Sequence, residues 1–191
     1  MQITQAGFAD PVRNAQSCFR AVLAAMASPG SVHSVSPAVT PPAPLSVAAA
    51  SVLLTLVDGE TAVYISDNFV DSADWLRFHC GCTPTEDRLA ARFLLASELP
   101  DFEQISAGSD EAPETSATII LQVASLASGR AYTLSGPGLQ RTATLLVTGL
   151  PDDFAARWAA NSKLFPRGVD LILCADSTIV ALPRSVAVRE G

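Results

Sequence analysis

The stretch that most constrains the fold is residues 161–173, where a helix must end and a buried strand must begin. Pro166 has no N–H and disfavours helical backbone at the residue before it, so the helix should end before Pro166. Gly168 can adopt a positive φ and turn the chain into residues 169–173, which are apolar except for Asp170. Such a run is typical of a strand that is covered on both faces of a sheet.

The same stretch offers candidate contact residues. Arg167 lies in the short loop between this helix and this strand, where a planar guanidinium can form a bidentate contact with a phosphate or a carboxylate. We therefore take Arg167, Asp170 and Asn161 as candidate contacts with a ligand or a partner. Two structural alternatives stay open, since Arg167 would also suit pairing with Asp170 or capping the last carbonyl groups of the helix.

A second candidate is the loop Ser135-Gly136-Pro137-Gly138, in which Gly136 and Gly138 are free to adopt unusual φ values. Backbone N–H groups in such loops can bind an anion. The loop is not a P-loop, because no Lys-Ser/Thr follows it, and it does not match G-x-G-x-x-G. A plain hairpin or crossover turn is the alternative.

Charge and composition argue against several classes of function. The net charge of -7 and the pI of about 4.7 argue against nucleic acid or an anionic membrane as partner. Charged residues are only 16% of a chain that is 49% hydrophobic, so some apolar surface is expected to meet a partner. The sequence shows neither a long apolar run nor a signal peptide, and we expect a cytoplasmic protein.

The cysteines predict neither a disulfide framework nor a metal site. The chain is long and shows no repeated cysteine spacing. His79-Cys80-Gly81-Cys82 has C-x-C spacing, whereas zinc sites usually contain C-x2-C pairs, and the only other histidine is His33. We therefore expect no bound metal.

Helix and strand signals interleave and predict one domain over residues 1–191. Asp10-Pro11 supplies an N-cap and a proline at the first position of a helix, followed by one apolar stripe (Ala15, Cys18, Phe19, Val22, Leu23 and Met26). Further helices are expected over 45–56, 68–79 and 151–164, and strands over 31–36, 62–65, 91–96, 117–124, 132–134, 142–147, 169–174 and 178–182, before an irregular tail. Short turns near the end require antiparallel pairing, so we predict an α/β fold with a mixed sheet.

No motif in the chain identifies a reaction. The G-x-S-x-G elbow of serine hydrolases and the H-E-x-x-H zinc motif are both absent. Lys163, the single lysine, lies on the last turn of a helix, where a lysine is favourable without any catalytic role.

Several segments, taken in order, carry a resemblance to a known family. They are Gly7-Phe8-Ala9-Asp10-Pro11, Phe19-Arg20-Ala21-Val22, Ala25-Met26-Ala27-Ser28-Pro29-Gly30, Leu54-Thr55-Leu56-Val57-Asp58, Trp75-Leu76-Arg77-Phe78-His79, Gly81-Cys82, Ala107-Gly108-Ser109-Asp110-Glu111, Ile120-Leu121-Gln122-Val123, Leu134-Ser135-Gly136-Pro137-Gly138, Leu164-Phe165-Pro166-Arg167-Gly168-Val169-Asp170-Leu171 and Val180-Ala181-Leu182-Pro183-Arg184. From about residue 7 to residue 185 the chain resembles the PhnH family, subunits of the bacterial carbon–phosphorus lyase system. It departs from that family at Ala112-Pro113 and over residues 83–91, both expected to be surface loops.

The resemblance implies a three-layer α/β/α fold with a mixed sheet, similar to the large domain of PLP-dependent transferases but without PLP. It implies a homodimer in isolation that joins PhnG, PhnI and PhnJ in a core complex and acts with the ATP-binding subunit PhnL. That system transfers an alkylphosphonate to ribose C1 of ATP and releases adenine, giving α-D-ribose 1-methylphosphonate 5-triphosphate. ATP is then a substrate of the complex, and the resemblance implies no catalytic residue in this subunit.

Three hypotheses remain open at this stage. The first is an accessory subunit of that transferase. The second is a self-sufficient enzyme on a transferase-like fold, and the third is an interaction subunit with a vestigial ligand pocket and no part in the chemistry.

Overall fold

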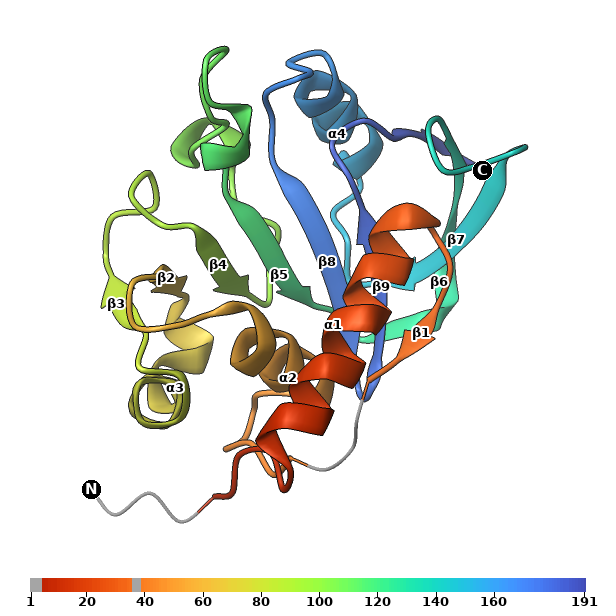
Figure 1. Ribbon diagram of the computed structural model, residues 1–191. Coiled ribbons are helices and arrows are strands. Elements are labelled where there is room, and N and C mark those ends of the chain that lie inside the picture. The colour runs from red at the N-terminus through yellow and green to blue at the C-terminus, as the bar shows by residue number, and fades with distance from the viewer. Residues whose placement is uncertain (1–4, 36–38) are drawn as a thin grey trace.

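The computed structural model describes residues 5–35 and 39–191 and is built around a seven-stranded mixed sheet with the order β1-β9-β8-β5-β4-β2-β3 (Figure 1). The strands from β8 to β3 are parallel, whereas β9 is antiparallel to both β8 and β1. The bounds are β1 (His33–Ser34), β2 (Ala62–Ile65), β3 (Thr83–Thr85), β4 (Phe93–Ala96), β5 (Thr118–Gln122), β8 (Asp170–Ala175) and β9 (Thr178–Leu182).

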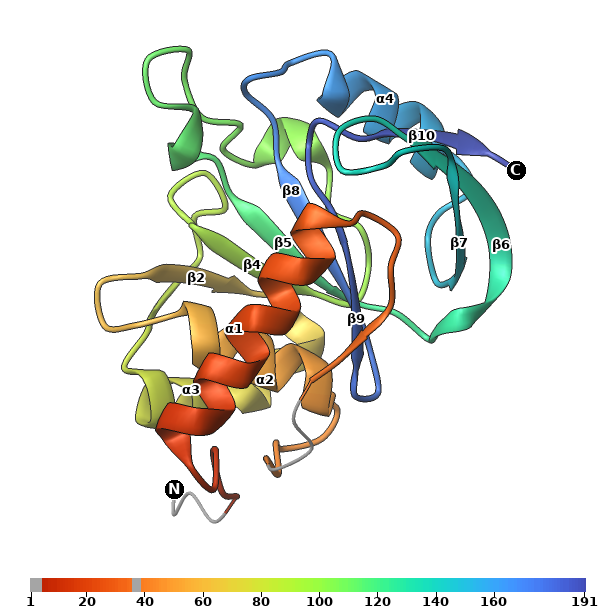
Figure 2. The ribbon, with the colours of Figure 1, turned by 45° about the vertical axis from the view of Figure 1, so that its right-hand side comes forward.

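Three α-helices cover one face of this sheet, as Figures 1 and 2 show. They are α1 (Pro11–Ala27), α2 (Val47–Leu56) and α3 (Ala73–Cys80), and the 3-10 helix η1 (Asp67–Ser72) leads into α3. Successive side chains of a strand point to opposite faces, so Ile120 packs against these helices while Ile119 and Leu121 pack on the other side. Both faces of the central strands are therefore buried.

The opposite face is covered by α4 (Phe154–Ser162) and by a three-stranded antiparallel sheet with the order β10-β6-β7 (Figure 2). The strands of this small sheet are β6 (Ser125–Ser135), β7 (Ala143–Thr148) and β10 (Ala187–Glu190). Tyr132 and Leu145 of the small sheet join Phe154 and Trp158 of α4 in one core cluster with the main sheet. Two short 3-10 helices, η2 (Phe102–Gln104) and η3 (Pro113–Thr115), lie in the connection from β4 to β5.

The predicted α/β class and mixed sheet are confirmed, but the layer opposite α1 contains a sheet as well as a helix. The prediction of an irregular C-terminal tail is wrong, since the tail contains β10, which pairs with the distant β6. The expected loop over residues 83–91 begins with β3, which pairs with β2. Pro84 fits there because an edge strand tolerates the loss of a backbone donor. The strand predicted over residues 31–36 is reduced to β1, and residue 36 lies outside the described residues.

Helix α1 begins as predicted, because the Asp10 carboxylate accepts a hydrogen bond from the backbone N–H of Arg13 at 3.1 Å. Its buried stripe is narrower than predicted, since the Phe19 and Leu23 side chains are 45% and 52% exposed. Val12, which is 79% exposed, lies on the same side of the helix at a spacing of two turns from Phe19. We call Val12, Phe19 and Leu23 the α1 outer face.

Because the strands from β8 to β3 are parallel, the sheet has an amino end, where they begin, and a carboxyl end, where they finish. At the amino end, Phe93, Thr118 and Asp170 are in register where β4, β5 and β8 begin. At the carboxyl end, which is lower in Figure 1, the same strands run out into their following loops.

Within the described part of the chain, no helix has the length and apolar character that a membrane span requires.

Candidate functional site

The loop that carries Arg167 connects α4 to β8, as predicted, and it lies at the amino end of the sheet. Helix α4 ends at Ser162, Gly168 adopts a φ of +114°, and Asp170 opens β8. A Cβ on Gly168 would lie 2.9 Å from Asn161 Oδ1, so both the backbone conformation and the close approach require glycine.

Asp170 is held by Arg184 rather than by Arg167. Arg184 Nε donates to Asp170 Oδ1 at 3.1 Å, Arg184 Nη2 donates to the other carboxylate oxygen, and the backbone N–H of Arg184 also donates to Oδ1 at 2.8 Å. Arg184 Nη1 donates to the carbonyl of Pro113 at 2.9 Å. The two charged side chains are only 15% and 20% exposed. This bidentate pair therefore ties β8, the end of β9 and the β4–β5 connection together.

Arg167 instead lies beside Asp110 of the acidic loop, with its Nε 3.0 Å from Asp110 Oδ1. The contact is an ion pair without hydrogen-bond geometry, and the two side chains are 40% and 74% exposed. Both structural alternatives for Arg167 are wrong, because Asp170 is paired elsewhere and no hydrogen bond from Arg167 to an α4 carbonyl is found among the described residues. The Arg167 guanidinium remains partly accessible at the surface.

Asn161 is only 3% exposed, and its side chain forms its hydrogen bonds within the protein. Its Nδ2 donates to the carbonyl of Val169 at 2.9 Å, and its Oδ1 accepts from the N–H of Val169 at 2.8 Å. The side chain thus pairs with both backbone groups of Val169, as a neighbouring strand would, and it fixes the end of α4 to the start of β8. Because it is buried, this side chain is not accessible to a ligand.

Gly136 and Gly138 lie in the loop between β6 and β7 with φ values of +133° and +85°. A Cβ on Gly138 would lie 2.4 Å from the carbonyl oxygen of Ala27, at the end of α1, and one on Gly136 would lie 3.1 Å from the carbonyl oxygen of Ser185. Because β6 and β7 pair antiparallel on either side of this loop, the hairpin-turn alternative is confirmed. The nearest neighbours of these glycines do not include Arg167, and the predicted candidates do not converge on one site.

A half-open pocket of about 370 Å³ lies at the carboxyl end of the sheet, over β2 and β4. Its lining consists of Tyr64, Ser66, Asp67, Asn68, Arg88, Leu94, Ala96, Ser97, Glu98, Leu99 and Pro100. The two strands come together because Ile65 of β2 is in register with Leu95 of β4. A more apolar hollow that shares Tyr64 and Asp67 adjoins it.

This pocket lies where the chain leaves the sheet toward opposite faces. After β2 the chain continues through η1 and α3 on the α1 side, toward β3. After β4 it continues through η2 on the other side, where the Phe102 ring lies 6.1 Å from the Trp158 ring of α4. In open α/β sheets, ligands bind outside the carboxyl ends of the strands at such a switch point. The position therefore marks this pocket as the candidate site.

Arg88 is the cation in the pocket lining. Its Cζ lies 4.7 Å from the centre of the Tyr64 ring, Nη2 donates to Tyr64 Oη at 2.9 Å, and Nη1 donates to Gln104 Oε1 at 2.8 Å. Both acceptors are neutral. Across residues 5–35 and 39–191, no carboxylate forms an ion pair with Arg88. A half-buried guanidinium without a counter-ion is a favourable site for an anion.

This pocket was not predicted from the sequence, although the chain carries a signal for it. Polar residues follow both strands directly, as Ser66-Asp67-Asn68 after β2 and as Ser97-Glu98 after β4. What the sequence did not show is that β2 and β4 are neighbours, because β3 lies between them in the chain and was expected to be a loop.

The thiols do not form a second site. In the described part of the chain, no group of three or more His, Cys, Asp or Glu side chains is arranged to hold a metal ion. All four cysteines are free, and burial raises the pKa of Cys18 and of Cys174. A hydrogen bond between the two thiols lowers the pKa of Cys80 and raises that of Cys82.

Comparisons with known proteins agree with each other. Residues 6–189 match the family model described as "Bacterial phosphonate metabolism protein (PhnH)". The alpha-D-ribose 1-methylphosphonate 5-triphosphate synthase subunit PhnH of Rhizobium meliloti (strain 1021) is 39% identical over 193 residues, covering 98% of this chain and 96% of the relative. A putative C-P lyase subunit protein, HtxG, of Stutzerimonas stutzeri is 32% identical over 179 residues, covering 91% of this chain and 85% of that relative.

Proposed function

This chain belongs to the PhnH family of bacterial phosphonate metabolism proteins, and from that premise we propose that it is a subunit of an alpha-D-ribose 1-methylphosphonate 5-triphosphate synthase. The observation that carries the proposal is the similarity along nearly the whole chain to a subunit of that name. The complex would transfer an alkylphosphonate to ribose C1 of ATP and release adenine, as part of phosphonate breakdown by the carbon–phosphorus lyase system.

We propose that this chain is an accessory subunit of the complex. It would form a single PhnH-like domain and act in the cytoplasm. A likeness to the large domain of PLP-dependent transferases is part of the proposal and is supported by the mixed sheet between two covering layers. PLP is not proposed as a cofactor, because Lys163 is exposed at the end of α4 and no other lysine exists to form a Schiff base. ATP is proposed as a substrate of the complex.

Exposed apolar side chains support assembly with other subunits. The α1 outer face is one such surface, and further exposed apolar side chains are those of Val70, Phe78 and Leu89. Apolar surface of this kind often marks a protein–protein contact. We propose PhnG, PhnI and PhnJ as partners in a core complex, PhnL as a further partner, and a homodimer when the chain is alone.

Native mass spectrometry of the chain co-expressed with PhnG, PhnI and PhnJ tests this proposal. We expect one stoichiometric assembly that contains all four proteins. A lone dimer of this chain beside an assembled remainder would contradict the proposed subunit role.

The competing interpretation is an interaction subunit whose pocket is vestigial. It predicts that a complex carrying Arg88→Gln assembles and transfers methylphosphonate to ATP as fast as the unmodified complex does. If the pocket takes part in the reaction, the same complex assembles but loses transfer activity. Mass spectrometry and the transfer assay on the same preparation separate the two.

A further inference from the structure

We propose that the pocket at the carboxyl end of β2 and β4 binds a phosphorylated or phosphonylated sugar, with Arg88 on the oxyanion and the rim carboxylates on sugar hydroxyl groups. The preference for an oxyanion follows from the pocket residues alone. The choice of a ribose ester as the sugar rests on the proposed function.

Arg88 is held by neutral partners. A guanidinium has five N–H donors, and the two hydrogen bonds of Arg88 go to the neutral oxygens of Tyr64 and Gln104. These contacts fix the side chain over the Tyr64 ring without neutralising it. A preorganised arginine loses little freedom when it binds a phosphate, so its remaining donors are suited to one.

Two hydroxyl groups beside Arg88 add donors. Ser66 Oγ is a buried atom with no hydrogen-bond partner among the described residues, which is costly unless something else binds it. Ser97 Oγ accepts a hydrogen bond from Asn68 Nδ2, so its own proton remains available. Both serines line the pocket. Ser66 Oγ has almost no exposed area, so it would meet a ligand oxygen only after its side chain rotates toward the pocket.

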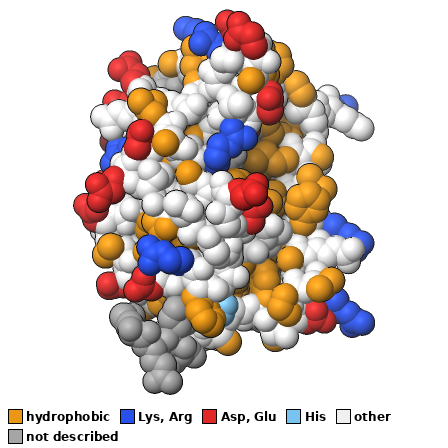
Figure 3. All heavy atoms as spheres, turned by 60° about the vertical axis from the view of Figure 1, so that its left-hand side comes forward, with side chains coloured by type: hydrophobic (Ala, Val, Ile, Leu, Met, Phe, Trp, Pro, Cys, Tyr) orange, Lys and Arg blue, Asp and Glu red, His pale blue; other side chains and the backbone are white. Residues whose placement is uncertain are grey.

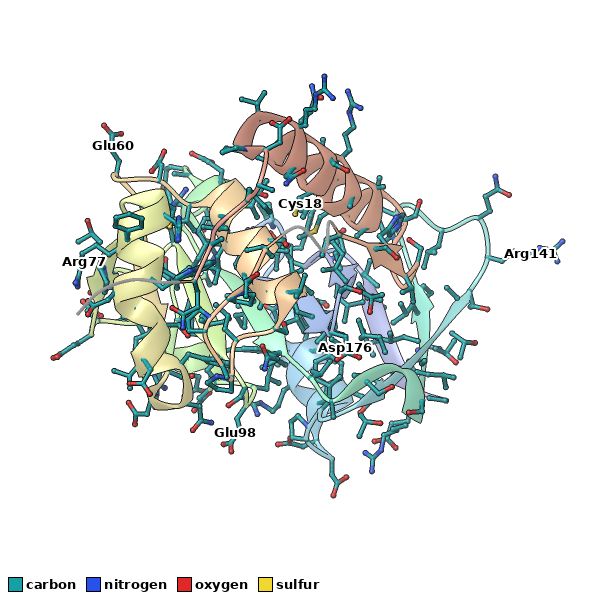
Figure 4. The ribbon with its side chains drawn as sticks, turned by 90° about the horizontal axis from the view of Figure 1, so that it is seen from below. Cys18, Glu60, Arg77, Glu98, Arg141 and Asp176 are labelled. Atoms are coloured by element: carbon teal, nitrogen blue, oxygen red, sulfur yellow. The ribbon has the colours of Figure 1, made fainter. Side chains whose placement is uncertain are left out.

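Two carboxylates on the pocket lining exclude a bare anion as the best ligand. Asp67 and Glu98 are exposed residues of the lining, and in the view from below Glu98 lies at the edge of the molecule (Figure 4). Carboxylates repel a phosphate but accept hydrogen bonds from hydroxyl groups. A ligand that carries both an oxyanion and hydroxyl groups offers a partner to Arg88 and to the two carboxylates of the lining.

Size and surroundings are consistent with a small molecule. A cavity of about 370 Å³ is within the range of about 300–1,000 Å³ that small ligands occupy. On the face of the molecule that brings the β3 side forward, positive and negative side chains are scattered without a patch of one sign (Figure 3). Such a face does not suit a polyanion.

Isothermal titration calorimetry on the purified full-length chain tests the inference with ribose 5-phosphate, inorganic phosphate and ribose as probes. We expect ribose 5-phosphate to bind at least about 10-fold more tightly than either phosphate or ribose. Arg88→Gln should weaken that binding by about 10- to 100-fold, the loss expected for a hydrogen bond to a charged group, and Arg88→Lys should restore part of it.

Two further variants keep the result interpretable. Arg141→Gln removes an exposed arginine that projects from the loop between β6 and β7 (Figure 4), and it should leave binding unchanged. Ser66→Ala removes the unpartnered hydroxyl and should weaken binding even if Arg88→Gln fails to fold. No binding of ribose 5-phosphate, or equal binding by the unmodified chain and a folded Arg88→Gln variant, would overturn the inference.

The outcomes also separate this inference from the proposed function. A chain that assembles with its partners but binds no ribose ester refutes the pocket inference alone. A chain that binds the ester but stays outside the complex refutes the proposed subunit role alone.

Discussion

The two ends of the parallel sheet use arginine in opposite ways. At the amino end, Arg184 is largely buried and its charge is neutralised by a bidentate contact with Asp170. At the carboxyl end, Arg88 is half-buried, and its partners within the described residues are neutral. A guanidinium that the fold itself satisfies stabilises the fold, whereas one without a counter-ion is available to a ligand. We therefore assign structural work to the amino end and binding to the carboxyl end.

The largest effect on stability should come from Arg184→Ala. The substitution leaves Asp170 charged and partly buried without its partner, which typically costs about 3–5 kcal/mol in free energy of unfolding. Urea denaturation followed by circular dichroism measures this loss. The double variant Arg184→Ala with Asp170→Ala should recover part of it, because no orphan charge remains. If the single variant lost less than about 1 kcal/mol in free energy of unfolding, the structural role assigned to the amino end would be contradicted.

Asn161→Ala should have the next largest effect. It leaves the buried N–H and C=O of Val169 without their partners, at a cost of about 1–3 kcal/mol for each unsatisfied group. The matched control is Asn68→Ala at the carboxyl end, an exposed asparagine whose loss should change stability by less than about 0.5 kcal/mol. Equal losses for the two variants would show that the two ends do not differ as we infer.

Arg88→Gln should cost about 1 kcal/mol or less, because the contact of Arg88 with the Tyr64 ring is partly exposed. Thermal unfolding of this variant beside Arg184→Ala gives the comparison directly. If Arg88→Gln destabilised the chain as much as Arg184→Ala does, Arg88 would be a structural residue. The assignment of binding to the carboxyl end would then fail.

Arg167→Ala should have the smallest effect on stability, below about 1 kcal/mol, since Arg167 and Asp110 form an exposed ion pair. The sequence made Arg167 a candidate contact, and its accessible guanidinium leaves that prediction open. Growth of a strain carrying Arg167→Ala on methylphosphonate as sole phosphorus source tests it. Normal assembly together with normal growth would show that Arg167 contacts neither a ligand nor a necessary partner.

Local signals in the sequence predicted the parts of the fold that depend on near neighbours. Asp10 and Pro11 identified the start of α1, and the apolar run over residues 117–124 identified β5. The failures have a common cause, because β3 and β10 exist only through pairing with distant strands.

The same cause explains the candidate residues. Asp170 and Asn161 were chosen for their position beside a buried strand, and that position is real. The partner of Asp170, Arg184, lies beyond β9 and follows from tertiary packing. Asn161 bonds instead with the nearby Val169, through the turn at Gly168. Arg88 lies in a stretch without a motif, and it becomes notable only when β2 and β4 are adjacent.

One measurement tests the division between the two ends most directly, namely a titration of the ¹⁵N-labelled chain with ribose 5-phosphate followed by two-dimensional NMR. We predict that the amide signals of Ser66, Arg88 and Ser97 shift progressively with ligand, while those of Gly168 and Asp170 do not move. Shifts confined to Gly168 and Asp170, or no shifts at all, would contradict the account.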